Sequence, residues 1–365
     1  MTLNGKDRVT IQTLHGEFVF AKQRLLRADE TDTDYLEATK QKAISAGLEE
    51  LSLYYVNRLS FREVQRLVER VSGHPLVCAQ TLWNGALQKV VALDTGLARE
   101  VAACQDLPAP EIAPRVDIYA PEAEEVLVLT DAIGVKAQKP TRDKPGTAPT
   151  PKEAKRHDTD VLLLERPDGD FVYLAGSTDG AVSLVDVVGA RVRKEWGKRD
   201  TALPVVALTD GARHIRLDLT ALFGPNVTII LDWYPLERRV YEQLAMMAHS
   251  KTEREGWERT VLGYLWRGRV SEALSFVGGL SVRNEKKQSE LVGYLEKHAD
   301  EIIDYERRRA AGKWISSGCM EKAVDQVIGM RQKKKGMSWT KQGSQTLAAL
   351  KIAELNGEWE QLFAA

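Results

Sequence analysis

Pro204-Val-Val-Ala-Leu-Thr-Asp210-Gly211 and Thr228-Ile-Ile-Leu-Asp232 are two short apolar stretches that each end on an aspartate. Short apolar runs rich in Val and Ile, followed by turn residues, are typical of buried strands. Upstream, Glu125-Val-Leu-Val-Leu-Thr-Asp131 has the same form. Open α/β sheets place their ligands at the carboxyl ends of their strands. We therefore expect some of these carboxylates to lie together at one edge of a sheet.

The elements around these strands predict a mixed sheet. Two further apolar runs flank the turn Pro167-Asp-Gly169, which is a strong hairpin signal. Residues 134–138 are expected to form a hairpin with the first strand, and helices are expected over 181–196 and 211–223. The resulting order is three antiparallel strands, a helix, a strand, a helix and a strand. This order predicts a mixed α/β fold of the ribonuclease H kind.

The region before this sheet reads as helical. Ser60, with Glu63 three residues later, forms a capping box at the start of one helix. A turn at 72–75 separates it from a second helix that carries polar residues near its start. This is the pattern of a DNA-binding helix-turn-helix. The spacing fits an ordinary helical hairpin equally well.

Composition restricts the class of protein. The chain has 365 residues, 43% of them hydrophobic, and a net charge of −1. Any nucleic-acid surface must therefore come from local basic patches. The three cysteines form no CxxC pair, which fits a reducing cytoplasm. No apolar run reaches the roughly 18 residues of a membrane span, so we expect no membrane association.

The aspartates suggest a metal site, together with Glu321, which falls in a helical pattern after a Ser/Gly loop. Carboxylates are the hard oxygen ligands that Mg²⁺ prefers. Two such ions about 3.5–4 Å apart can stabilise both oxygens of an in-line phosphoryl transfer. Aspartates at strand ends are also common without this role, and single carboxylates in helices are usually solvated.

Several motifs resemble those of DDE transposases of bacterial insertion sequences. The resemblance is close to the ISKra-type family and more distant to the mutator-like group, and it spans about residues 45–356. The motifs that carry it are Leu129-Thr-Asp131-Ala-Ile-Gly-Val-Lys-Ala-Gln-Lys-Pro140, Arg156-His-Asp-Thr-Asp160, Ala207-Leu-Thr-Asp210-Gly-Ala-Arg, Ile229-Ile-Leu-Asp232-Trp-Tyr, Gly293-Tyr-Leu-Glu-Lys-His298, Ser317-Gly-Cys-Met-Glu321-Lys and Lys335-Gly-Met-Ser-Trp339-Thr-Lys-Gln-Gly343.

The resemblance implies a transposase that cleaves and transfers DNA strands at insertion-sequence ends. It implies a catalytic and metal-binding triad of Asp131, Asp210 and Glu321, holding Mg²⁺ or Mn²⁺, as two ions. Asp232 matches the first position of the group's (C/D)-x-x-H motif. Asp232 is then either a supporting or substrate-contacting residue, or the second metal ligand in place of Asp210. We favour Asp210 as the ligand.

The expected partner is DNA, both the terminal inverted repeats and the target, bound by a homo-oligomer in the nucleoid. The side chains expected to contact DNA are Arg331, Lys333, Lys334, Lys335, Trp339, Lys341, Gln80, Thr81 and Asn84. The basic residues would bind phosphates, and Trp339 would stack on a base. A solvated charged loop is the alternative interpretation of the basic run.

These expectations divide the chain into domains. The predicted parts are a mostly helical DNA-binding domain at 1–104, a linker at 105–124, a ribonuclease H-like catalytic core at 125–235 and 313–356, and an all-helical insertion at 236–312.

The sequence departs from the family pattern beside the expected site. The histidine expected three residues after Asp232 is Pro235, which has no polar side chain. Ser316-Ser317-Gly318-Cys319 stands where the family has Gly-Ser-Gly-Arg, so a cation is missing. The chain also begins late for this family. The alternative function is therefore a catalytically impaired or truncated transposase that binds DNA without cleaving it.

Overall fold

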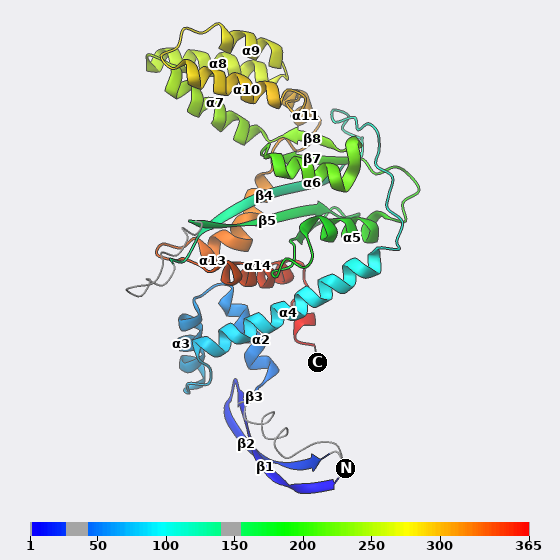
Figure 1. The fold of residues 1–365 in the computed structure, drawn as a ribbon, viewed down its shortest axis with the longest axis vertical. Coiled ribbons are helices and arrows are strands. Elements are labelled where there is room, and N and C mark those ends of the chain that lie inside the picture. The colour runs from blue at the N-terminus through cyan, green and yellow to red at the C-terminus, as the bar shows by residue number, and fades with distance from the viewer. Residues whose placement is uncertain (1, 27–42, 140–154, 365) are drawn as a thin grey trace, which may run out of the picture. The chain divides into compact units, whose positions relative to one another are not determined.

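The computed structural model describes residues 2–26, 43–139 and 155–364, and the chain divides into two compact units (Figure 1). The first unit comprises residues 1–96, 135–157 and 326–365, and the second comprises residues 97–134 and 158–325. Each unit is described by itself.

The second unit is built on a five-stranded sheet. Its strands are β4 (Val126–Lys136), β5 (Arg156–Glu165), β6 (Phe171–Leu174), β7 (Val205–Thr209) and β8 (Thr228–Leu231). They lie in the order β6-β5-β4-β7-β8 (Figure 1). β5 and β6 are antiparallel, whereas β7 runs parallel to both β4 and β8. The predicted order of elements and the mixed sheet are confirmed.

One predicted hairpin is wrong. Residues 134–138 do not turn back on the first strand, because β4 continues without a break to Lys136. The neighbour of β4 on that side is β5, which comes after the intervening loop. Asp131 therefore lies within β4 and not at its end. Ala-Ile-Gly-Val contains no residue pair that favours a tight turn, which explains the continuation.

Two helices pack on the sheet at the positions that the sequence predicts. α5 (Leu184–Trp196) begins after Ser183, which forms a reciprocal capping box with Asp186. α6 (Arg213–Phe223) connects β7 to the short turn before β8. Their apolar faces meet the strands in one core, with Leu164, Val188 and Leu219 among its buried members. All five residues of β7 are buried, as expected of a central strand covered on both faces.

The segment after β8 is helical, as predicted. It contains α7 (Trp233–Met247), α8 (Lys251–Trp266), α9 (Val270–Gly278), α10 (Glu285–Lys297) and α11 (Tyr305–Ala310). Leu291 and Leu295 of α10 are fully buried. In α8 the buried side chains are Val261 and Leu265.

The chain then forms the short helix α12 (Gly318–Val324), which carries Glu321 in its first turn. A π-helical turn at Asp325–Gly329 and α13 (Met330–Gln332) follow.

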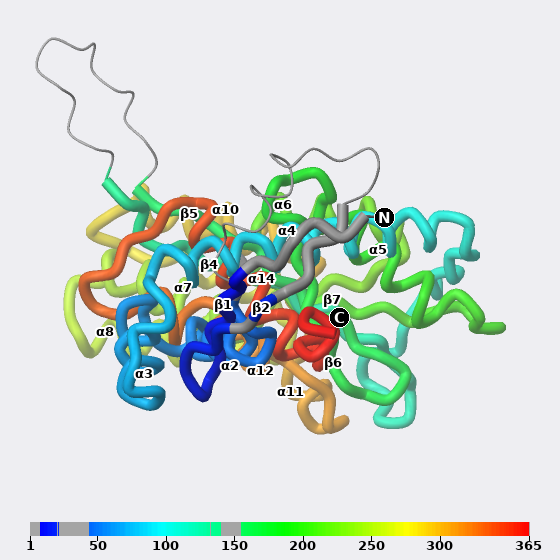
Figure 2. Tube along the Cα trace, turned by 90° about the horizontal axis from the view of Figure 1, so that it is seen from below, coloured from blue at the N-terminus to red at the C-terminus, as the bar shows by residue number. Residues whose placement is uncertain are grey.

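The first unit joins a hairpin to a helical cluster. β1 (Thr2–Thr13) and β2 (Gly16–Leu26) pair around a turn at residues 14–15, and β3 (Ala43–Ile44) adds to β1. The helices are α2 (Ala46–Val56), α3 (Phe61–Ser72), α4 (Ala79–Cys104) and α14 (Lys341–Leu355). α2 and α3 lie side by side (Figures 1 and 2).

The two predicted helices, α3 and α4, form where the sequence places them, and the choice between a DNA-binding helix-turn-helix and an ordinary helical hairpin stays a prediction. Ser60 and Glu63 make both bonds of the capping box, and Gly73 ends α3 with a φ of 73°. The buried core of the first unit includes Leu48, Val64 and Leu347, so α14 packs together with α2 and α3. Of the helices in the described ranges, none is both long and apolar enough to cross a bilayer.

Candidate active site at the edge of the mixed sheet

The register of three neighbouring parallel strands aligns the three predicted aspartates. Leu129 of β4 pairs with Leu208 of β7, and Thr209 of β7 pairs with Leu231 of β8. The backbone amide of Asp232 donates to the Thr209 carbonyl at 2.8 Å, so this ladder extends past β8. Continuing both registers places Asp131 and Asp232 on either side of Asp210. Parallel neighbours lie about 4.8 Å apart, so this continuation sets the Asp131 backbone, within β4, beside the residues that follow β7 and β8.

Asp210 is the exposed member of this row. It follows the last residue of β7, and its Oδ1 accepts a hydrogen bond from the Ala212 amide at 2.9 Å. Gly211 takes a φ of 84°, which allows the chain to turn into α6. The turn holds the carboxylate at the surface, where it can meet a ligand.

Asp232 has a different environment, because this residue is only 2% exposed. One carboxylate oxygen accepts from the Tyr234 amide at 3.0 Å and so caps α7. The other accepts from the Ser317 amide at 2.7 Å and from the Ser317 hydroxyl. The carboxylate of Asp232 therefore links the end of β8 to the start of α12.

The other two acidic residues of the predicted triad lie on different elements. Asp131 is partly buried within β4, and Glu321 is exposed in the first turn of α12. Over residues 2–26, 43–139 and 155–364, no three His, Cys, Asp or Glu side chains gather as a group that could hold a metal ion. The alignment of Asp131 with Asp210 is thus a backbone relationship, and the position of Glu321 beside them stays a prediction.

An open cleft of about 490 Å³ lies against Asp210. Its walls come from the turn after β7, from α7 and from the end of α10. The lining residues are Asp210, Gly211, Ala212, Pro235, Arg238, Arg239, Glu242, Tyr294, Lys297 and His298. The cleft is mostly polar and carries three cations. Sequence reasoning did not single out these three.

A buried ionic network supports one wall of the cleft. His298 is 1% exposed, and its Nδ1 lies 2.6 Å from Glu301 and 3.2 Å from a guanidinium nitrogen of Arg216. Arg216 also forms an ion pair with Glu301 at 2.5 Å. The His298 ring packs closely on Gly211, where an added Cβ would lie 2.7 Å from Cε1. The network therefore fixes the turn that presents Asp210.

Tyr294 faces the same cleft from α10. Burial raises the pKa of its hydroxyl to about 12, with Arg239 opposing and Asp210 adding to the shift. The phenol stays protonated at neutral pH and can donate a hydrogen bond. The guanidinium of Arg239 lies 5.5 Å from the centre of the Tyr294 ring.

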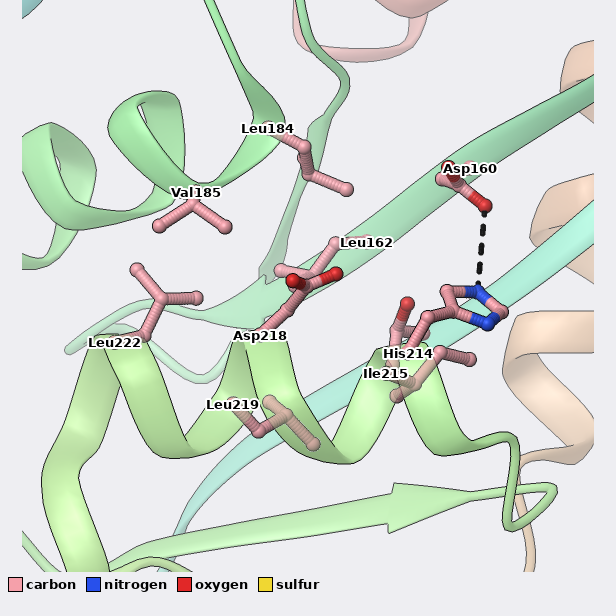
Figure 3. A pocket seen from close by; sticks show the side chains of 10 residues that line it. Asp160, Leu162, Leu184, Val185, His214, Ile215, Asp218, Leu219 and Leu222 are labelled. Atoms are coloured by element: carbon pink, nitrogen blue, oxygen red, sulfur yellow. Dashed lines mark ion pairs between the residues drawn. The ribbon is translucent and has the colours of Figure 1, made fainter.

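A second, much smaller cavity lies between β5 and α6 (Figure 3). The Asp160 carboxylate and the His214 ring form a 3.9 Å ion pair at its rim, above an apolar floor. Partial burial raises the pKa of Asp160, and His214 opposes this shift. The volume of about 20 Å³ admits little more than a water molecule. This cavity is not a substrate site.

The predicted DNA contacts of the first unit fall into two groups. Lys333, Lys334, Lys335 and Lys341 are exposed, as a DNA-contacting surface requires. Lys334 also donates to the Arg58 carbonyl at 3.2 Å.

Arg331 and Trp339 differ from this expectation. Arg331 is only 3% exposed, and its Nε donates to the Val56 carbonyl at 2.8 Å. Its guanidinium stacks on the Trp339 ring at 4.9 Å, and the Trp339 indole donates to the Gln332 carbonyl at 2.9 Å. Both side chains are held by packing within the unit. Arg331 is buried and Trp339 is partly buried, so both have a structural role, and their predicted contact with DNA stays a prediction.

The polar residues at the start of α4 remain candidates. Gln80 and Asn84 are exposed and hydrogen-bonded to each other at 2.9 Å. Thr81 is partly buried, with its hydroxyl 3.1 Å from the Cys78 thiol. Trp83, in the same turn of the helix, packs edge-to-face on Phe61. The helix thus presents amide side chains outward and an indole inward.

Comparisons with known proteins identify no family. No family model matches the chain, and no curated protein matches it. Among solved structures, the chain is similar to one in a "Drosophila P element transposase strand transfer complex". The TM-score is 0.26 at 10% identity, covering 92% of this chain and 84% of that chain. A likeness this weak carries no argument about fold or function, so the function proposed below rests on the sequence motifs and on the geometry of the site.

Proposed function

We propose that this chain is a DNA transposase that cleaves and transfers strands at insertion-sequence ends. Asp131, Asp210 and Glu321 are its metal-binding carboxylates in this proposal. The observation that supports it is the register of β4 and β7, which pairs Leu129 with Leu208 and, if it continues for two residues, brings Asp131 and Asp210 onto adjacent parallel strands. The mixed sheet and its flanking helices are consistent with a ribonuclease H-like core.

The chemistry of these side chains fits divalent cations. Carboxylate oxygens are the hard donors that Mg²⁺ and Mn²⁺ take. Two ions held by the three acids would stabilise charge on the attacking and leaving oxygens of a phosphodiester. Asp210 is the better ligand of the two neighbouring aspartates, because its carboxylate is exposed beside the cleft. The oxygens of Asp232 are already occupied by Tyr234 and Ser317.

In this proposal, neighbouring residues position the metal-binding carboxylates. Asp232 holds the start of α12 and so positions the helix that carries Glu321. His298 and Gly211 fix the turn that presents Asp210. The protonated Tyr294 offers a neutral hydrogen-bond donor to a phosphate oxygen in the cleft. None of these roles requires the residue itself to react.

The test is metal-dependent cleavage of DNA. The purified chain is incubated with Mg²⁺ or Mn²⁺ and duplexes made from the DNA that flanks its reading frame, including any terminal inverted repeats. We expect nicks at the element ends and none in EDTA. Asp131→Ala should abolish them, while Asp168→Ala, which removes an exposed turn carboxylate, should not. Equal nicking by Asp131→Ala would sink the proposed triad, and cleavage of any DNA or RNA without end preference would favour a general nuclease.

A second function rests on Pro235. This residue lines the cleft beside Asp210 and offers no polar group to a substrate. A chain that binds element ends without cutting them would fit this feature. Salt-dependent end binding with no cleavage in either metal would favour this second function. Restored nicking in Pro235→His would then identify Pro235 as the cause.

A further inference from the structure

The cleft beside Asp210 has more cations than carboxylates, and of these cations Arg239 also lies over the Tyr294 ring. Arg238, Arg239 and Lys297 line it, against the carboxylates of Asp210 and Glu242. Within the part of the chain that the structure describes, none of the three cations forms an ion pair with a carboxylate. All three side chains are exposed. Cations left unpaired in a concave site are available to an anionic ligand.

The helical spacing explains why these groups converge. Pro235, Arg238, Arg239 and Glu242 stand at positions i, i+3, i+4 and i+7 of α7, so they share one face. Lys297 is the last residue of α10, which packs against α7. The end of α10 thus adds a third positive charge to the wall formed by α7.

Two exposed aromatic rings also stand on α7, outside the residues that line the cleft. Tyr234 and Tyr241 are 54% and 42% exposed, and they stand two turns apart on α7. Arg238 lies four residues after the first and three before the second, so the two rings flank it. Guanidinium and ammonium groups interleaved with exposed aromatic rings are the features that bind single-stranded nucleic acid. A small isolated anion would not need the rings.

We propose that the cleft between α7 and α10 binds the phosphate backbone of a single DNA strand that leads to Asp210. Arg238, Arg239 and Lys297 contact its phosphates, and Tyr234 and Tyr241 stack on unpaired bases. This inference rests on the proposed function, because it assigns to that site the strand on which Asp210 acts. It places the strand on the helical segment, apart from the lysines at 333–335.

The binding experiment compares two matched triple variants in EDTA, so that no cleavage occurs. The cleft variant is Arg238→Ala, Arg239→Ala and Lys297→Ala. The control variant is Lys251→Ala, Arg259→Ala and Lys286→Ala, which removes three exposed cations from the same helical segment outside the cleft lining. Affinity for a fluorescent single-stranded 20-mer is measured over a range of salt concentrations. Circular dichroism and melting confirm that both variants are folded.

We expect the cleft variant to bind on the order of 100-fold more weakly at 0.1 M salt, since each phosphate contact on a single strand contributes about 0.7 to the salt slope. The slope itself should fall by about 2. The control variant should match the unmodified chain. Equal binding by the cleft variant, or no binding by the unmodified chain, would overturn the inference.

Lysine footprinting provides a readout on the unmodified chain, which covers the case of a variant that does not fold. Acetylation of Lys297 should slow when the oligonucleotide is added, while acetylation of Lys251 on α8 should not change. Unchanged reactivity of Lys297 would contradict the inference. If Lys297 is protected but the chain nicks no DNA in Mg²⁺ or Mn²⁺, the proposed catalysis fails and the strand-binding cleft stands.

Discussion

The buried carboxylate of Asp232 accepts hydrogen bonds from both the backbone amide and the hydroxyl of Ser317, and the amide bond measures 2.7 Å. Asp232 directly follows β8, the last strand in the sheet order, and Ser317 precedes the helix that carries Glu321. The two residues therefore join distant parts of the chain at the candidate site. Ser317 therefore has a defined structural role at the start of α12.

Replacing Asp232 should destabilise the second unit. Asp232→Ala leaves the amides of Tyr234 and Ser317 without their acceptor in a buried place, at a cost of about 2–4 kcal/mol. Urea denaturation measures the loss. Ser317→Ala keeps the backbone bond and should cost only about 1 kcal/mol. Two equal losses would show that the carboxylate bond to the hydroxyl, and not the amide bonds, is the main contribution.

Asp210→Ala should have little effect on stability but a large effect on activity. The side chain is exposed and accepts only the local Ala212 bond, so stability should change by less than about 1 kcal/mol. Nicking should fall by at least about 1,000-fold, since a bound metal supplies several kcal/mol of transition-state stabilisation. Gel assays with Mg²⁺ test the rate. A stable and fully active Asp210→Ala variant would show that Asp210 is not a metal ligand.

Local patterns predicted most of the sheet, because the relevant signals lie within a few residues. The runs ending at Asp210 and Asp232 form β7 and β8, and the Ser60–Glu63 capping box starts α3 as expected. Hydrophobic strands and helix caps are local effects of the side chains involved. The register that aligns Asp131 with Asp210 depends on pairing between strands far apart in sequence.

The residues that the sequence misassigned or missed have a common physical cause. Arg331 belongs to a basic run that looks solvent-exposed, yet the fold covers it with Val56 and Trp339. The cations of the cleft come from α7 and from the end of α10, and only helix packing brings them together. A single sequence does not show which distant side chains a fold will cover or assemble.

Gly211→Ala should disturb the candidate site more than a glycine substitution elsewhere. Its φ of 84° strains any residue with a Cβ, and the new atom would lie 2.7 Å from His298 and 2.9 Å from Leu231. Gly169 has the same φ of 84° but open space around it, so Gly169→Ala measures the backbone strain alone. We expect about 1 kcal/mol for Gly169→Ala and about 2–4 kcal/mol for Gly211→Ala by denaturant unfolding. Equal losses of stability in the two variants would show that the His298 side chain moves away from the new Cβ at no cost in free energy.

Arg331 and Lys335 should separate stability from DNA binding in the first unit. Arg331→Ala removes a buried guanidinium that holds Val56 and Trp339, so it should lower stability by about 2–3 kcal/mol. Lys335→Ala changes an exposed side chain and should leave stability within about 0.5 kcal/mol. Its binding to duplex DNA should weaken, with a salt slope shallower by about 1. Unfolding curves and fluorescence anisotropy test both, and a stable Arg331→Ala with weakened binding would support the DNA-contact role.

Removing one partner of the ion pair between Arg308 and Glu125 should strongly destabilise the second unit. Arg308 is fully buried, and its two terminal nitrogens bind the Glu125 carboxylate at 2.8 and 2.7 Å. Glu125→Ala leaves Arg308 and the nearby Lys313 without their counter-ion, so we expect a loss of about 3–5 kcal/mol. A double variant, Glu125→Leu with Arg308→Leu, removes both charges together. Its loss of stability should be smaller, by about 1–3 kcal/mol, than the summed losses of the single variants Glu125→Leu and Arg308→Leu, as measured by a double-mutant cycle in urea. Additive losses would mean that solvent reaches the unpaired charge, which the burial of Arg308 argues against.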